Sequence, residues 1–108
     1  MTITRLFDIL EHQLAHTPKA DCIATKEGGT WRPYSTQQVL DTAEQLAMGL
    51  LALGIRPGDK VALASTNRSE WSLVDQALLR SGAINVPLYA TSSAADYAYV
   101  LHHSGARI

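Results

Sequence analysis

The spacing of apolar residues along the chain predicts four helices. In each helical segment the apolar side chains recur every three to four residues, which places them on one face of a helix. The predicted helices cover residues 5–16, the stretch between Ser35 and Gly54, residues 70–81, and a last segment that starts at Ser92 or Ser93 and runs to Ser104.

Side chains suited to capping lie at the ends of these segments. Thr4 and Ser69 precede the first and third helices, and each hydroxyl could accept a free N–H group there. Ser35 and Gln38 have the spacing of a capping box, in which each side chain bonds the backbone N–H of the other residue. Three glycines, Gly54, Gly82 and Gly105, follow the later helices and predict left-handed C-caps, with Ile55 folding back on the long helix.

Short apolar runs between the helices predict strands. Residues 21–26 and 30–34 flank Gly28 and Gly29, which is the signal of a β-hairpin. Two further runs, 60–65 and 83–89, alternate with helices, and residues 106–108 begin what looks like another strand. Strands that alternate with helices form mostly parallel sheets, because each crossover returns the chain to the same end. We therefore expect an α/β fold: a helix, a β-hairpin, then alternating helices and mostly parallel strands.

Composition excludes several classes of protein. With 46 % apolar and 18 % charged residues, the 108-residue chain is expected to fold and not to be disordered. Its net charge is −1 and its cations are scattered, which argues against nucleic-acid binding. The longest apolar run, 46–55, is too short to cross a bilayer, and no secretory leader is visible. Cys22 is the single cysteine, so we expect no internal disulfide and a cytoplasmic location.

No familiar catalytic motif is present. The glycines match neither phosphate-binding loop pattern, and no nucleophile elbow occurs. The Gly28-Gly29-Thr30 run could offer N–H groups to an anion, but a hairpin turn is the favoured interpretation because no helix begins there.

Isolated side chains suggest weaker hypotheses, each with a plainer alternative. His12 and His16 have the spacing of two metal ligands on a helix, but no third ligand accompanies them. Cys22 is expected to be a buried structural residue of a strand, and Asp59 a turn residue in a solvated pair with Lys60. One apolar stripe could line an acyl pocket, although core packing is the more common role of such a stripe. The stripe consists of Trp71, Leu73, Val74, Ala77 and Leu78.

Three segments resemble the adenylate-forming (AMP-binding) superfamily, in the family's order and spacing. Trp31-Arg-Pro-Tyr34-Ser35-Thr-Gln-Gln-Val39 is similar to its first core motif. The run from Gly49 through Pro57-Gly58-Asp59-Lys60 is similar to the helix, turn and strand that follow. Leu79-Arg-Ser-Gly82-Ala-Ile-Asn-Val-Pro87 is similar to its second core motif, where Gly82 would permit close packing and Pro87 would end sheet hydrogen bonding.

Further segments resemble long-chain fatty acid–CoA ligases in particular. These are Asn67-Arg-Ser-Glu-Trp71, Val86-Pro-Leu-Tyr-Ala-Thr-Ser-Ser93 and Leu101-His-His-Ser-Gly-Ala-Arg107. Departures from that subgroup occur at Ser69 and Ala90, where proline is usual, and at His102, where asparagine is common. They leave the superfamily resemblance intact and the preferred chain length open.

The resemblance implies a two-step ligase reaction for a longer parent protein. Residues 1–108 would be the N-terminal fragment of its AMP-binding domain, a scaffold expected to be inactive alone, with the C-terminal remainder absent. The parent would use fatty acid, Mg-ATP and coenzyme A to make an acyl-adenylate and then a thioester. The family's phosphate-binding and magnesium-binding groups lie downstream of the second core motif. We therefore expect no catalytic, cofactor-binding or metal-binding residue in this chain.

Two alternatives stay open. The chain could be a stand-alone α/β binding or interaction module derived from that fold, or part of an adenylating ligase for another carboxylic acid. We further expect self-association through an exposed sheet edge or apolar face, and at most peripheral contact with a membrane.

Overall fold

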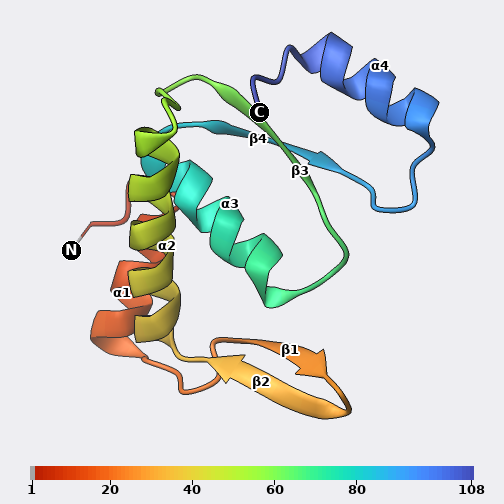
Figure 1. Cartoon of the computed structure of the whole chain (residues 1–108). Helices are drawn as coiled ribbons and strands as arrows, with labels where there is room; N and C mark the ends of the chain where they lie inside the picture. The colour runs from red at the N-terminus through yellow and green to blue at the C-terminus, as the bar shows by residue number, and fades with distance from the viewer. Residues whose placement is uncertain (1) are drawn as a thin grey trace.

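The computed structural model describes residues 2–108, and within them helices and strands follow the predicted order (Figure 1). The elements are α1 Asp8–His16, β1 Ile23–Glu27, β2 Thr30–Tyr34, α2 Thr36–Ala52, β3 Lys60–Ala64, α3 Ser69–Ser81, β4 Ile84–Leu88 and α4 Ala94–Ser104. The α/β architecture expected from the sequence is confirmed.

β1 and β2 form an antiparallel hairpin that stands apart from the other strands (Figure 1). Its register runs from the Ile23–Tyr34 pair to the Glu27–Thr30 pair. Gly28 and Gly29 form the turn with φ of 55° and 80°, the two positive values that a type I′ turn requires. The hairpin interpretation of these glycines is therefore confirmed, although β1 starts later than predicted.

β3 and β4 form a parallel pair connected by α3, as the alternating pattern predicted. Pairing continues to Ala64 opposite Leu88, so the expectation that Pro87 ends the hydrogen bonding is wrong. The Ile84 N–H donates to the Asp59 carbonyl at 2.7 Å. Because backbone groups alternate in direction along a strand, the N–H groups of residues 84, 86 and 88 face β3. Pro87 falls on the other alternation, so its missing N–H faces the free edge and interrupts no bond to β3.

The last residues lie along the opposite edge of β3. The Arg107 N–H donates to the Lys60 carbonyl at 2.8 Å, and the Ala62 N–H donates to the Ile108 carbonyl at 2.7 Å. Three residues are too few for a regular strand, but these bonds follow the path that the sequence predicted.

The core lies between α2, α3 and the first residues of β3. It consists of buried Ile55, Val61, Leu78 and Ala83, with Leu50 and Val74 packed against them. Ile55 enters this core because α2 ends as predicted: the Ile55 N–H bonds the Leu50 carbonyl at 3.1 Å while Gly54 takes a φ of +96°.

Gly82 brings the end of α3 against the turn before β3. A Cβ at this position would lie 3.1 Å from the Cβ of Pro57, and the Gly82 carbonyl accepts the Gly58 N–H at 2.8 Å. The predicted close packing at Gly82 is therefore confirmed.

Of the four predicted caps at helix N-termini, two are confirmed and two are wrong. Ser35 with Gln38, and Ser93 with Asp96, form capping boxes at the starts of α2 and α4. Thr4 does not cap α1; its N–H and hydroxyl instead donate to the buried carboxylate of Asp8.

The cap of α3 comes from another element. Ser69 lies inside the helix and its side chain caps nothing; its N–H donates to Thr25 Oγ1 at 2.6 Å, and the Thr25 hydroxyl donates to Ser69 Oγ at 2.6 Å. A residue of β1 thus supplies the first acceptor of α3 and ties the hairpin to it.

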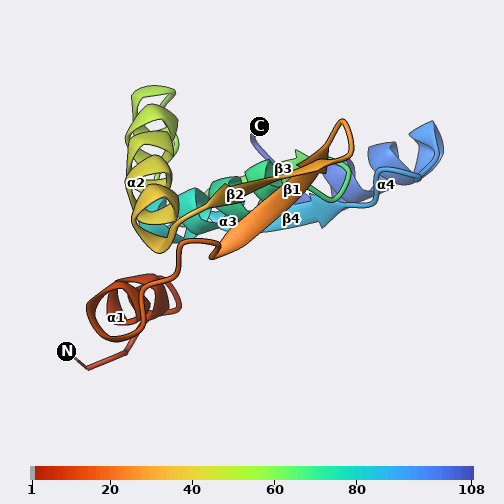
Figure 2. The same ribbon diagram turned by 90° about the horizontal axis from the view of Figure 1, so that it is seen from below.

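α1 lies to one side of the layer that contains the strands and α3 (Figure 2). Arg80 of α3 holds it: the guanidinium, 9 % exposed, donates to Glu11 Oε1 at 3.1 Å and lies 5.3 Å from the Phe7 ring. Among residues 2–108, no helix has the length and apolar character needed to cross a membrane.

Candidate functional site

A hollow of about 520 Å³ opens at the carboxyl ends of β3 and β4. In open α/β sheets, ligands bind in the crevice outside the carboxyl ends of the strands. The lining residues are Ser65, Thr66, Asn67, Trp71, Pro87, Leu88, Tyr89, Ala90 and Thr91. The position of this hollow makes it the candidate functional site.

The fold fixes each wall of the hollow. Ser65 to Asn67 follow β3 directly, and Trp71 lies in the first turn of α3 with its N–H bonded to the Arg68 carbonyl at 3.1 Å. On the other side, the Tyr89 carbonyl accepts the Tyr97 hydroxyl at 2.7 Å and the Ser92 N–H at 3.0 Å. α4 thereby holds the loop that follows β4.

No side chain that lines the hollow carries a charge. Hydroxyl and amide groups stand beside the indole of Trp71 and the apolar side chains of Pro87 and Leu88. Such a surface suits an apolar or uncharged part of a ligand. It does not fit the triphosphate of Mg-ATP, whose phosphates need cations or clustered N–H donors.

The predicted apolar stripe divides between core and site. Leu73, Ala77 and Leu78 are 3 %, 0 % and 0 % exposed, and Val74 packs against the core cluster. Trp71 alone of the stripe lines the hollow. Core packing is thus the role of four of the five residues.

Sequence reasoning missed the other walls, 65–67 and 87–91. A signal for them existed, because both segments directly follow predicted parallel strands. It was overlooked because these residues are small or uncharged and match no catalytic motif.

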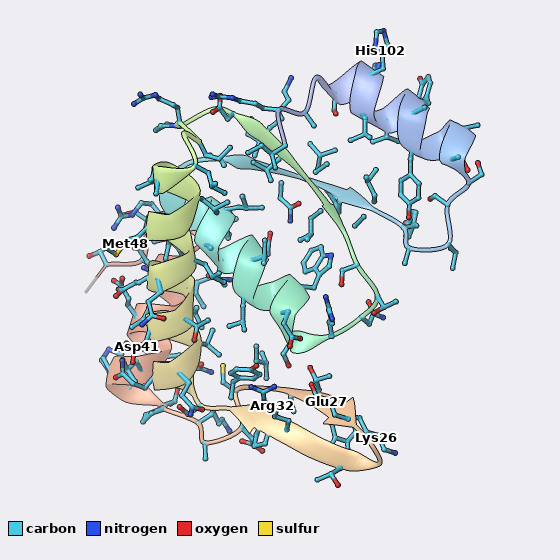
Figure 3. The ribbon with its side chains drawn as sticks, viewed as in Figure 1. Lys26, Glu27, Arg32, Asp41, Met48 and His102 are labelled. Atoms are coloured by element: carbon cyan, nitrogen blue, oxygen red, sulfur yellow. The ribbon has the colours of Figure 1, made fainter. Side chains whose placement is uncertain are left out.

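The isolated candidates do not assemble into a site. The rings of His12 and His16 lie 4.3 Å apart, and within residues 2–108 no three His, Cys, Asp or Glu side chains group as metal ligands. Cys22 is half-buried in the turn before β1, 3.2 Å from Gln13 Oε1, so its placement in a strand was wrong. His102 points away from the rest of the molecule (Figure 3).

Asp59 pairs with Arg107 and not, as expected, with Lys60. Its Oδ2 accepts the Arg56 N–H at 2.8 Å and an Arg107 guanidinium N–H at 2.9 Å. The bond from the Arg56 N–H, with that from Arg107, holds the pKa of Asp59 below its usual range. Arg107 also donates to the Gly54 carbonyl at 3.0 Å, so the pair fixes the turn between α2 and β3 to the end of the chain.

Comparison with known proteins identifies the family. A model described as "AMP-binding enzyme" matches residues 10–108. This chain belongs to the AMP-binding enzyme family. The resemblance of its core motifs is confirmed.

Individual relatives of this AMP-binding chain are ligases or are unassigned. It is 38 % identical over 78 residues to the long-chain-fatty-acid–CoA ligase FadD15 of Mycobacterium bovis, which covers 72 % of this chain and 13 % of FadD15. It is 30 % identical over 108 residues to Rv1549 of Mycobacterium tuberculosis, described as uncharacterized, covering 97 % of this chain and 59 % of Rv1549. The chain thus spans a small part of the first relative and over half of the second.

A solved structure agrees with the fold. A putative long-chain-fatty-acid CoA ligase from Rhodopseudomonas palustris superposes with a TM-score of 0.75 at 33 % identity, over 91 % of this chain and 24 % of that protein. This AMP-binding chain therefore has the fold of part of such ligases.

The candidate site also gathers the segments that carry the long-chain resemblance. Of the three such segments, two reach the hollow: Asn67 and Trp71 begin and end one, and residues 87–91 belong to the segment 86–93. Two segments that are distant in sequence, one at the start of α3 and one at the end of β4, thus line the same hollow.

Proposed function

We propose that this chain is the N-terminal segment of an ATP-dependent long-chain fatty acid–CoA ligase. In the parent, a fatty acid carboxylate would attack the α-phosphate of ATP to give an acyl-adenylate and pyrophosphate. The thiol of coenzyme A would then attack the acyl carbon and release AMP. The observation that carries the proposal is the meeting of two of the three long-chain segments, Asn67–Trp71 and 86–93, at the carboxyl ends of β3 and β4. The 38 % identity to FadD15 supports the same substrate class.

The role of the segment in that reaction is structural. Its hollow is uncharged and suits an apolar or neutral part of a substrate, so phosphate and magnesium ligands would come from downstream residues. Mg-ATP and coenzyme A are substrates of the parent, and we assign this chain no catalytic, cofactor-binding or metal-binding residue. A cytoplasmic enzyme, at most peripheral to a membrane, is consistent with this role.

Thioester formation by the full-length parent tests the substrate class. The parent, supplied with Mg-ATP and coenzyme A, should form acyl-CoA from long-chain fatty acids faster than from short-chain, aryl or amino acids. Thioester formation from an aryl or amino acid alone would place it in another branch of the family. A full-length gene without a Ser/Thr/Gly-rich phosphate loop downstream of Ile108 would end the ligase proposal itself.

One observation favours a second candidate, a stand-alone module. Rv1549 is matched along 59 % of its length, so a protein less than twice as long as this chain carries the same segment. A transcript that ends directly after Ile108, together with a stable soluble monomer, would support this candidate over the ligase segment.

A further inference from the structure

A second hollow, of about 600 Å³, separates the β-hairpin from the start of α3. It adjoins the candidate site, because both hollows are lined by Asn67 and Trp71. The lining residues are Ile23, Ala24, Thr25, Lys26, Trp31, Asn67, Arg68, Ser69, Trp71 and Ser72. We call it the hairpin hollow.

The floor of the hairpin hollow is held in a fixed shape. Thr25 and Ser69 exchange two hydrogen bonds of 2.6 Å, one from the Ser69 N–H and one from the Thr25 hydroxyl. These bonds fix β1 to α3, so the walls on either side keep their separation without a ligand. A preformed hollow avoids part of the ordering cost of binding.

Its walls combine two indoles with two cations. Trp31 comes from β2 and Trp71 from α3, so the hairpin and α3 each contribute a tryptophan to the lining. Lys26 lies at the outer part of the hairpin (Figure 3), and its Nζ is 5.9 Å from the centre of the Trp31 ring. Arg68 enters from the loop before α3, with its Nε bonded to Ser65 Oγ at 3.2 Å.

The two cations lack acidic partners in the described part of the chain. The ion pairs found within residues 2–108 involve Arg5, Arg32, Arg80 and Arg107, and neither Lys26 nor Arg68 takes part in one. No Asp or Glu lines the hairpin hollow. It therefore presents positive charge next to aromatic faces, which the uncharged site at the strand ends does not.

We propose that the hairpin hollow binds a small anion that carries a planar ring. Indoles stack on planar rings with little dependence on the ring's substituents, and Lys or Arg beside them attracts a negative group. Nucleoside monophosphates and aromatic carboxylates share this chemistry. The site is distinct from the hollow at the strand ends and does not depend on the proposed ligase activity.

Tryptophan fluorescence of the 108-residue chain tests the proposal with AMP and benzoate as probes. At least one of them should quench the indole emission saturably, and the tighter binder identifies which source of a ring-bearing anion the site prefers. Adenosine or benzyl alcohol, which keep a ring without the charge, and inorganic phosphate, which keeps a charge without the ring, should each bind about tenfold more weakly.

Matched variants separate the hairpin hollow from general charge effects. The double variant Lys26→Gln with Arg68→Gln should weaken binding about tenfold or more. The control Lys19→Gln with Arg56→Gln changes the net charge by the same amount and should leave the affinity unchanged. Trp31→Ala, at a side chain that is 63 % exposed, should also weaken binding while the far-ultraviolet circular dichroism stays unchanged. Absence of saturable quenching by both anions, or equal affinity in the two double variants, would overturn the proposal.

Discussion

At the scale of single residues, hydrogen bonds to backbone groups explain positions that side-chain type alone leaves open. Asp8 is 3 % exposed although it is acidic, because its carboxylate accepts N–H groups of Thr4 and Arg5 and the Arg5 guanidinium. A carboxylate at the first turn of a helix is favourable there. The predicted cap at Thr4 was wrong because the donor and the acceptor are reversed.

The bond from the Arg5 guanidinium, with the N–H groups of Thr4 and Arg5, lowers the pKa of Asp8 from 3.8 to about 2. A lowered pKa stabilises the folded state above pH 3.8, and this contribution is lost as the pH falls toward 2. The free energy of unfolding of Asp8→Asn should therefore lie below that of the wild type at neutral pH, and the difference should shrink through this window.

Urea unfolding at a series of pH values measures this difference. Asp41→Asn, at an exposed position on α2 (Figure 3), is the matched control and should keep the wild-type pH dependence in that window. A constant gap between Asp8→Asn and the wild type down to pH 2 would contradict the role given to Asp8.

The sequence predicted a glycine at the C-cap of α3, Gly82, but did not show that Pro57 packs against it. Its φ is +76°, and a Cβ would lie 3.1 Å from Pro57. The free energy of unfolding of Gly82→Ala should be lower by about 1–2 kcal/mol because of the left-handed backbone, and lower still because of the contact with Pro57.

Two other glycines serve as controls in the same urea unfolding measurement. Gly105→Ala has a φ of +69° and open space around it, so it should show the backbone cost alone. Gly49→Ala, inside α2 with nothing within 4 Å, should stabilise the protein by about 0.5–1 kcal/mol. Equal losses for Gly82→Ala and Gly105→Ala would show that the contact with Pro57 is unimportant.

At the scale of elements, the sequence predicted what depends on neighbouring residues and failed where partners are far apart. The capping box at Ser35, the glycine turn at 28–29 and the C-cap at Gly54 all follow from local patterns, and all are confirmed. Ser69 was predicted to cap α3. Nothing in the sequence shows that Thr25, 44 residues earlier, lies beside the helix and supplies the acceptor instead. The walls of the candidate site were missed for another reason: their residues follow predicted parallel strands but are small or uncharged and match no catalytic motif.

The attachment of the hairpin to α3 through Thr25 can be tested directly. Thr25→Val keeps the shape of the side chain and removes the acceptor of the Ser69 N–H, so the free energy of unfolding should fall by about 1–2 kcal/mol. Thr25→Ser should restore most of the loss. Thr30→Val, on the exposed face of the same hairpin, should have little effect; a loss as large as that of Thr25→Val would mean that the hairpin and not the cap is responsible.

At the scale of the whole molecule, apolar side chains remain exposed on several elements. Met48, Leu51 and Leu53, at and just after the end of α2, are 70 %, 51 % and 69 % exposed. Tyr89, which follows β4, and Tyr99 of α4 are 84 % and 68 % exposed. The free edge of β4 is a poorer surface for association, because Pro87 places no N–H there. Association of this chain with itself would therefore use side-chain faces rather than strand pairing.

We predict that the 108-residue chain forms dimers or larger oligomers in sedimentation velocity at high concentration. Met48→Glu with Leu53→Glu should shift the distribution toward the monomer, because charge on an apolar contact opposes burial. The matched control Gln37→Glu with Gln45→Glu adds the same charge at exposed polar positions of α2 and should leave the distribution unchanged. A wild-type chain that sediments as a monomer at every concentration would contradict the prediction.

We propose that this chain is the structural part of an adenylating domain whose chemistry lies in other residues. Exchange of labelled pyrophosphate into ATP, dependent on a long-chain fatty acid, reports the first step of that reaction. We expect exchange with the full-length parent and none with the 108-residue chain at the same concentration. Exchange by the chain alone, or none by the parent with any fatty acid, would contradict the account.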